Sequence, residues 1–106
     1  MTRRVADTDY YQPLTEHQLK VEVLRIAYKN GWLVYHVPAT NVRGSQGRGY
    51  PDLTLARDGK VLWLELKQEK ADQSNEQILW MFALGMAYHV IRPSDWSAGR
   101  VHELLQ

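Results

Sequence analysis

The stretch Tyr50–Gln77, YPDLTLARDGKVLWLELKQEKADQSNEQ, contains two short apolar runs separated by Asp58-Gly59. Both runs are rich in residues that favour strands, and Asp-Gly between such runs is a strong signal for a two-residue hairpin turn. With these two residues as the turn, Asp52 faces Glu65 across the hairpin. Cross-strand neighbours on one face have Cβ atoms roughly 4.5–5.5 Å apart. The hairpin therefore predicts two carboxylates side by side.

Two ionised carboxylates in this position need compensation. At ~4 Å and an effective dielectric constant of about 20, their repulsion is on the order of 4 kcal/mol. A divalent cation removes this cost, because Mg²⁺ binds one or two carboxylates and keeps waters for its other positions. Lys67 lies on the same face, about 6.6 Å beyond Glu65, where its ammonium could stabilise developing negative charge or orient an attacking water. We therefore expect Asp52 and Glu65 to hold Mg²⁺ or Mn²⁺ in a hydrolytic site.

Size and composition limit the class of protein. The 106 residues suffice for one domain, and 44% apolar residues with four Trp indicate a globular chain. Cysteine is absent, which excludes disulfides and thiolate zinc sites. No apolar run approaches ~20 residues and the N-terminal sequence lacks the apolar segment of a secretion signal, so we expect a cytoplasmic protein with no membrane partner. Because the net charge is only +1, any DNA-binding surface must be local.

Periodicity and turn signals predict one α/β domain at 14–106, with a small mixed sheet flanked by helices, preceded by a flexible arm at 1–13. The expected order is helix, three strands, helix, strand, helix. The elements are a helix from the Thr15 cap to about Asn30, strands at 32–37, on both sides of the turn and at 88–92, a helix between Ser74 and Gly85, and a short last helix capped by Ser94 or Asp95. We expect the stripe Ile78, Met81, Phe82 and Met86 to be buried in the core.

A third acidic residue is expected from the first helix. Glu16 points in the direction of its apolar stripe, and a carboxylate on that side needs a partner. The alternative is that Glu16 only complements the helix dipole. Glu22, at the border of the same stripe, is the second candidate for the third acidic residue.

Further polar residues surround the predicted site. Gln77 either forms a capping box with Ser74 or lies beside the catalytic Lys67; we hold the two roles as equal alternatives. Arg43 and Arg48 lie in the glycine-rich loop before Asp52, and Lys70 follows the second strand. These three residues are candidates for contacts with a DNA backbone.

The ordered set Pro51-Asp52, Glu65-Leu66-Lys67 and Ser74-x-x-Gln77 resembles the PD-(D/E)XK nuclease superfamily. The spacing, with Gly49-Tyr50 before the first acid and Arg92-Pro93 near the end, is most similar to the small stand-alone VRR-NUC domains. The resemblance covers roughly residues 15–105. It supports Glu16 as the third acidic residue and Gln77 as a site residue.

The resemblance implies a bacterial or phage Mg²⁺-dependent endonuclease that acts as a homodimer on branched DNA such as Holliday junctions. Two other classes stay open: a DNA-binding or assembly module that keeps the fold without cutting, and a small restriction-type nuclease. A restriction-type nuclease would need extra elements for reading bases in the major groove, and the chain has little room for them.

Overall fold

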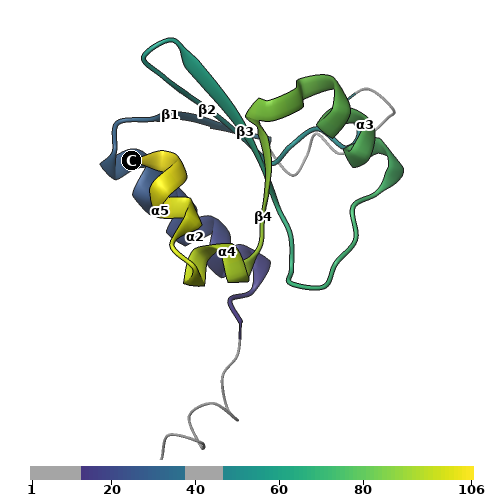
Figure 1. Cartoon of the computed structure of the whole chain (residues 1–106), viewed down its shortest axis with the longest axis horizontal. Coiled ribbons are helices and arrows are strands. Elements are labelled where there is room, and N and C mark those ends of the chain that lie inside the picture. Colours follow the sequence, from purple (N-terminus) through teal and green to yellow (C-terminus); the bar gives the residue numbers. More distant parts are fainter. Residues whose placement is uncertain (1–12, 38–46) are drawn as a thin grey trace, which may run out of the picture.

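The computed structural model describes residues 13–37 and 47–106, and it is an α/β fold built on a four-stranded mixed sheet (Figure 1). The strands lie in the order β1 (Leu33–His36), β2 (Leu53–Arg57), β3 (Lys60–Leu66) and β4 (Tyr88–Ile91). Neighbours among the first three are antiparallel, and β4 is parallel to β3. The predicted fold class is confirmed. The arm expected at 1–13 lies, except for Pro13, outside the described residues.

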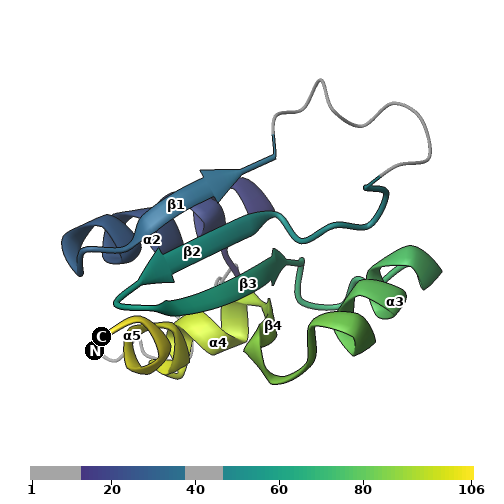
Figure 2. The same cartoon turned by 90° about the horizontal axis from the view of Figure 1, so that it is seen from above.

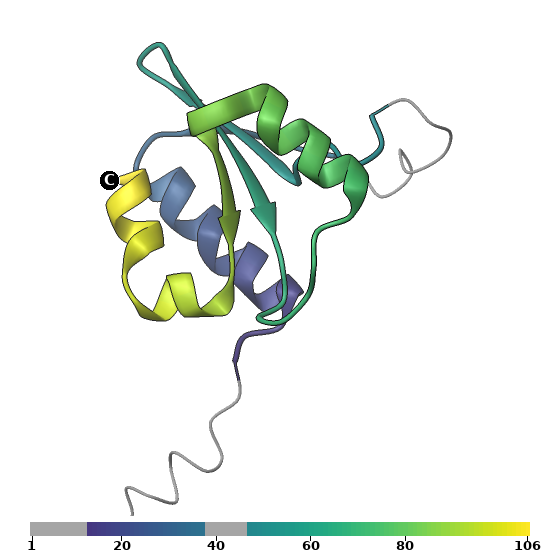
Figure 3. The same cartoon turned by 45° about the vertical axis from the view of Figure 1, so that its right-hand side comes forward.

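Helices cover the two sides of the sheet unequally (Figures 1 and 3). On one side α2 (Glu16–Lys29) packs with α4 (Pro93–Ser97) and α5 (Arg100–Leu105). On the other side lies α3 (Asn75–Leu84), which ends in a short 3₁₀ turn, η2 (Gly85–Ala87), before β4. None of the described helices is long and apolar enough to span a bilayer.

The β2–β3 hairpin has the predicted register. Asp58 and Gly59 have φ angles of 53° and 77°, and two positive φ values in a row are what a two-residue turn of this kind requires. Arg57 consequently pairs with Lys60. This register places five leucines on one face of the hairpin, all buried: Leu53, Leu55, Leu62, Leu64 and Leu66.

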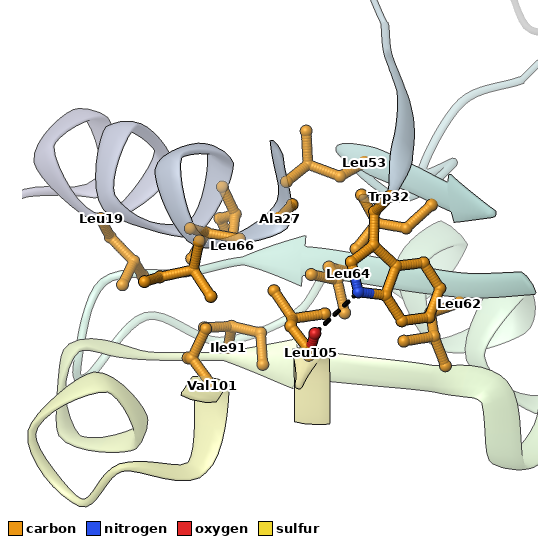
Figure 4. Close-up of a cluster of buried hydrophobic side chains, with 13 residues drawn as sticks. Leu19, Ala27, Trp32, Leu53, Leu62, Leu64, Leu66, Ile91, Val101 and Leu105 are labelled. Atoms are coloured by element: carbon orange, nitrogen blue, oxygen red, sulfur yellow. Dashed lines mark hydrogen bonds between the residues drawn. The ribbon is translucent and has the colours of Figure 1, made fainter. Parts of the chain in front are cut away.

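The leucine face forms the core with α2 and α5 (Figure 4). Trp32 closes one end of this core, where its indole Nε1 donates a hydrogen bond to the Leu105 carbonyl at 2.8 Å. The Arg57 guanidinium lies 4.2 Å from the centroid of the Trp32 ring and donates to the Asn30 carbonyl at 2.9 Å. Seen from above, this end of the sheet carries the hairpin turn and the C-terminus, whereas α3 lies at the opposite end (Figure 2).

The prediction that the apolar stripe of α3 is core is wrong. No residue of α3 is buried. Phe82 is 76% exposed, Leu79 69% and Met86, in η2, 96%. Periodicity identifies residues that share a side of a helix, but it does not say which side faces the sheet. Here Ile78 and Met81 are half-buried beside Gln77 and Trp80, whereas Leu79 and Phe82 are exposed.

The predicted last helix is two helices. Gly99 lies between α4 and α5 with φ of 79°, a left-handed conformation that interrupts the helix. The N-cap of α4 is Arg92, with Pro93 at the first helical position, rather than the predicted Ser94 or Asp95. Asp95 contributes from inside the helix, because its Oδ2 accepts a hydrogen bond from the Arg92 amide at 2.8 Å.

Candidate active site

Asp52 and Glu65 lie at the end of the hairpin remote from its turn. Asp52 directly precedes β2, and Glu65 is the second-last residue of β3. The Leu66 amide donates a hydrogen bond to Asp52 Oδ2 at 2.8 Å, which holds the Asp52 side chain across the gap between the strands. The hairpin register thus brings the two predicted acids together.

Glu65 is a buried acid with an incomplete set of partners. The residue is only 3% exposed. Its Oε2 accepts a hydrogen bond from Gln77 Nε2 at 2.7 Å, whereas Oε1 is buried without a hydrogen-bond partner. A buried polar atom without a partner costs on the order of 1–3 kcal/mol. Binding of a proton or a cation to this oxygen would therefore be favourable.

The two acids titrate as a pair. Burial, followed by the negative charge of Asp52, raises the pKa of Glu65 to about 8. Burial also raises the pKa of Asp52, against the opposing charges of Lys20 and Lys67. The proximity of the two carboxyl groups raises the pKa of Glu65 further and opposes the rise in the pKa of Asp52, so Glu65 is the acid that keeps the proton. Near pH 7 the pair without a cation therefore retains about one proton.

Gln77 has the predicted capping role and, in addition, contacts Glu65 rather than Lys67. Its Oε1 accepts a hydrogen bond from the Ser74 amide at 2.8 Å, and the Gln77 amide donates to Ser74 Oγ at 3.1 Å, which completes a capping box. Because the side-chain carbonyl points at a donor, the side-chain NH₂ is left to point at Glu65. One planar amide thus links the start of α3 to Glu65, so capping the helix does not prevent Gln77 from contacting the site.

The loop before Asp52 holds α3 in place for this contact. A Cβ atom on Gly49 would lie 2.6 Å from the main-chain carbon of Glu76, so glycine is required for this approach. The Trp80 indole donates to the Arg48 carbonyl at 3.0 Å. The rings of Tyr50 and Trp80 meet edge to face, with centroids 4.9 Å apart. These contacts fix the first turn of α3, and with it Gln77.

Lys67 directly follows β3 and is half-buried. Its amide donates to the Ile91 carbonyl at 3.0 Å, which extends the pairing with β4 by one residue. The next residues are held by Arg92, whose Nη1 donates to the carbonyls of Gln68 (2.8 Å), Glu69 (3.2 Å) and Ala71 (2.8 Å). The backbone on both sides of Lys67 is therefore fixed.

Glu16, rather than Glu22, is the acidic residue of α2 at the site. A pocket of about 340 Å³ is lined by Glu16 and Asp52, and the charge of Glu16 contributes to the raised pKa of Glu65. Glu22 instead forms an ion pair with Arg25 at 2.7 Å. Within 13–37 and 47–106, no group of three or more acidic or histidine residues is arranged to hold a metal ion.

Of the three predicted DNA-binding residues, the structure describes Arg48 and Lys70. Arg43 lies outside the described residues. Arg48 lies four residues before Asp52, on the loop that packs on α3, and Lys70 is exposed in the link that Arg92 holds. Sequence reasoning missed His17 and Lys20, which line the same pocket as Glu16. The spacing of Glu16 and Lys20, four residues apart on one helix, was the available signal.

The donor set suits a hard divalent cation. Two adjacent carboxylates, one with a buried oxygen lacking any partner, match the preference of Mg²⁺ for one or two carboxylates plus water. Comparison of the chain with protein-family models, curated proteins and solved structures gives no significant match. The resemblance to VRR-NUC domains therefore stays a prediction that depends on motifs and geometry.

Proposed function

We propose that this protein is a Mg²⁺- or Mn²⁺-dependent endodeoxyribonuclease of the VRR-NUC type within the PD-(D/E)XK superfamily. The observation that carries the proposal is the pairing of Asp52 with a buried Glu65 that has one oxygen without a partner. A structural ion pair is the plain alternative. It does not fit, because none of the ion pairs among the described residues involves either acid.

In the proposed reaction each residue has a defined task. Asp52 and Glu65 would hold the cation, and Glu16 would complete its shell through water. The cation supplies a lowered pKa for a bound water and stabilises charge on the scissile phosphate. Lys67 orients the attacking water and offsets negative charge that develops on the phosphate. Gln77 keeps Glu65 Oε2 in a fixed position, so that the carboxylate does not rotate away.

The proposed substrate is branched DNA, and the proposed active form is a homodimer in a bacterial or phage-infected cell. Exposed apolar side chains support association: Leu79 and Phe82 in α3, and Met86 in η2. Large exposed apolar side chains that lie near one another in a helix often mark protein interaction sites. A two-fold axis between identical subunits would present two sites, one for each strand to be cut.

The decisive experiment incubates the purified protein with four-way junction, duplex and single-stranded DNA, in Mg²⁺, Mn²⁺ or EDTA. We expect metal-dependent cutting that is fastest on the junction, and loss of cutting by at least about 100-fold in Asp52→Asn and Lys67→Ala. The matched controls are Asp58→Asn and Lys60→Ala, which change the same residue types at the exposed turn of the same hairpin. They should cut like the wild type.

Other outcomes assign the chain to another class. Junction binding without cutting in any metal would indicate a non-cleaving module. Cutting of duplex DNA at one fixed sequence would indicate a restriction-type enzyme. Cutting that persists in EDTA or in Asp52→Asn would rule out the proposed mechanism.

A further inference from the structure

The face of the sheet opposite the leucine core is apolar and uncovered near the hairpin turn. Its residues alternate with the buried leucines, and cross-strand pairing joins them into two rows across β1, β2 and β3. The members of this uncovered face are Leu33, Ala56, Val61, Tyr35, Thr54 and Trp63. None of the six is charged, and no described helix lies over this end of the sheet (Figure 2). An uncharged face of this kind suits an apolar partner rather than a phosphate backbone.

The same side of the sheet carries a second apolar set at its other end, where α3 lies (Figures 2 and 3). Leu79 and Phe82 are three residues apart in α3 and share one side of the helix, and Met86 follows in η2. We call these three residues the α3 ridge. No residue of this ten-residue helix is buried, although helices in proteins gain most of their stability from packing. The α3 ridge therefore has little to pack on within the described part of its own chain.

We propose that two copies of this chain associate about a twofold axis that lays the α3 ridge of each copy on the uncovered face of the other. This inference rests on the proposed homodimer and names its two surfaces. Each copy is a sheet with a helix at one end of one face, so two copies placed head to tail fill each other's uncovered end. The contact between ridge and sheet then forms twice and the assembly closes, as a twofold interface requires.

The exposed apolar area matches what a stable dimer needs. On the uncovered face Leu33 is 75% exposed, Tyr35 56% and Val61 38%, and the residues of the α3 ridge are more exposed still on average. At roughly 200 Å² for each fully exposed large side chain, the two sets together expose on the order of 800 Å² per copy. Each partner contributes about 800 Å² to a standard protein interface. A second copy of the chain therefore accounts for both surfaces at once.

This arrangement leaves the paired acids open to a substrate. The pocket beside Asp52 is lined by Glu16 and His17 of α2, on the side of the sheet away from the α3 ridge. The proposed contact also stabilises α3, which carries Gln77 and its hydrogen bond to Glu65. Association therefore supports the position of Glu65 without covering the pocket.

Cross-linking tests the reciprocal contact directly, because the chain contains no cysteine and every introduced thiol is unique. Phe82→Cys places a thiol on the α3 ridge, and Val61→Cys places one on the uncovered face. We expect a short bismaleimide to give a covalent dimer in the double variant and in a mixture of the two single variants, but not in either single variant alone. The control is Val21→Cys, at an exposed position of α2, which should not cross-link to Phe82→Cys.

Exchange of charge provides a second measurement that does not depend on the cross-linker. Tyr35→Glu and Phe82→Lys should each weaken dimerisation at least about 30-fold, as loss of an aromatic side chain at the centre of an interface does. Their mixture should dimerise again, because a mixed pair has one wild-type contact and one contact between glutamate and lysine. Sedimentation equilibrium of each variant and of the mixture measures this.

Three results would overturn the reciprocal interface. The first is cross-linking of Phe82→Cys or Val61→Cys alone, which would mean that α3 meets α3 or that sheet meets sheet. The second is a Tyr35→Glu variant as dimeric as the wild type. The third is a monomeric wild type, which would also remove the proposed homodimer. None of these measurements needs cutting, so they decide the interface separately from the nuclease function, which the cleavage assay tests.

Discussion

The side-chain amide of Gln77 donates a hydrogen bond to Glu65 at 2.7 Å while the same side chain caps α3 through its carbonyl oxygen. Glu65 is thereby positioned by a helix that has no buried residue of its own. The orientation of Glu65 depends on where the first turn of α3 lies. Mutation of Gln77 can separate its capping of α3 from its hydrogen bond to Glu65.

Gln77→Glu should keep the cap and disturb the acid. A glutamate at this position still accepts from the Ser74 amide, but it presents a second acceptor to Glu65 and raises the pKa of Glu65 further. We expect cleavage to fall at least about tenfold near pH 7 and its pH profile to shift upwards. Gln77→Ala should lose both functions, with about 1 kcal/mol of stability as well. Cleavage rates from pH 6 to 9 with thermal unfolding check this, and wild-type rates in Gln77→Glu would contradict it.

Glu65→Gln should change how stability depends on pH. The pKa of Glu65 is 4.5 in the unfolded chain and about 8 in the fold, so the folded state binds the proton more tightly. The free energy of unfolding then decreases as pH rises from about 4.5 to about 8. The glutamine amide does not titrate, so the variant should gain roughly 2–5 kcal/mol relative to the wild type between pH 5 and 9. Urea unfolding at both pH values measures this. The exposed Glu103→Gln is the control, and a Glu65→Gln difference that is equal at both pH values would refute the prediction.

Cation uptake should release a proton. Near pH 7 the acid pair retains about one proton, which a cation must displace. Calorimetric titration with Mn²⁺ or Mg²⁺ in buffers of different ionisation enthalpy should show release of about one proton at pH 7 and much less at pH 9. The affinity should rise with pH up to about 8. Binding without buffer dependence would mean that the acids share no proton, and no binding would remove the basis of the nuclease proposal.

Gly49→Ala and Gly47→Ala form a matched pair. Both glycines have positive φ, 82° and 76°, so alanine costs roughly 1–2 kcal/mol of backbone strain at either position. A Cβ on Gly47 meets no atom within 4 Å, whereas on Gly49 it would lie 2.6 Å from Glu76. We expect Gly49→Ala to be clearly less stable than Gly47→Ala and to lose most cleavage. Melting temperatures and single-turnover rates measure this. Equal behaviour of the two variants would show that the approach of the loop to α3 does not position the site.

Phe82→Glu should separate the subunits without unfolding them. The side chain is largely exposed, so its replacement removes little packing within one chain. If α3 forms the interface, the variant should be monomeric by light scattering at concentrations at which the wild type is dimeric. Tyr28→Glu introduces the same charge at an exposed aromatic residue on α2 and should leave the dimer intact. A dimer that persists in Phe82→Glu would place the interface elsewhere.

The features of the fold and of the candidate site that could be predicted from sequence are those determined by local interactions. A two-residue turn at Asp58-Gly59 fixes the register of the hairpin, and the register alone brings Asp52 to Glu65. The cap at Thr15 and the stop at Gly31 likewise set the limits of α2. Each of these features depends on residues close together in the chain, whose conformational preferences agree with the fold.

The features that could not be predicted from sequence depend on contacts between segments that are distant in the chain. The position of α3 follows from the contacts of Gly49 and Trp80, which lie far apart in the chain, and no periodicity within the helix contains that information. Sequence reasoning preferred Glu16 to Glu22, but the pocket that Glu16 shares with Asp52 depends on how α2 packs on the sheet. Lys20 was overlooked for the same reason, because its position beside Asp52 is set by the packing of α2 and not by the local sequence.

The exposed turn at Asp58-Gly59 lies at the far end of the strands from the paired acids. A peptide inserted there would lengthen a solvent loop without altering the leucine face or the paired acids. The hairpin thus offers a point of attachment at which a targeting module or a fluorophore could be joined to this small domain.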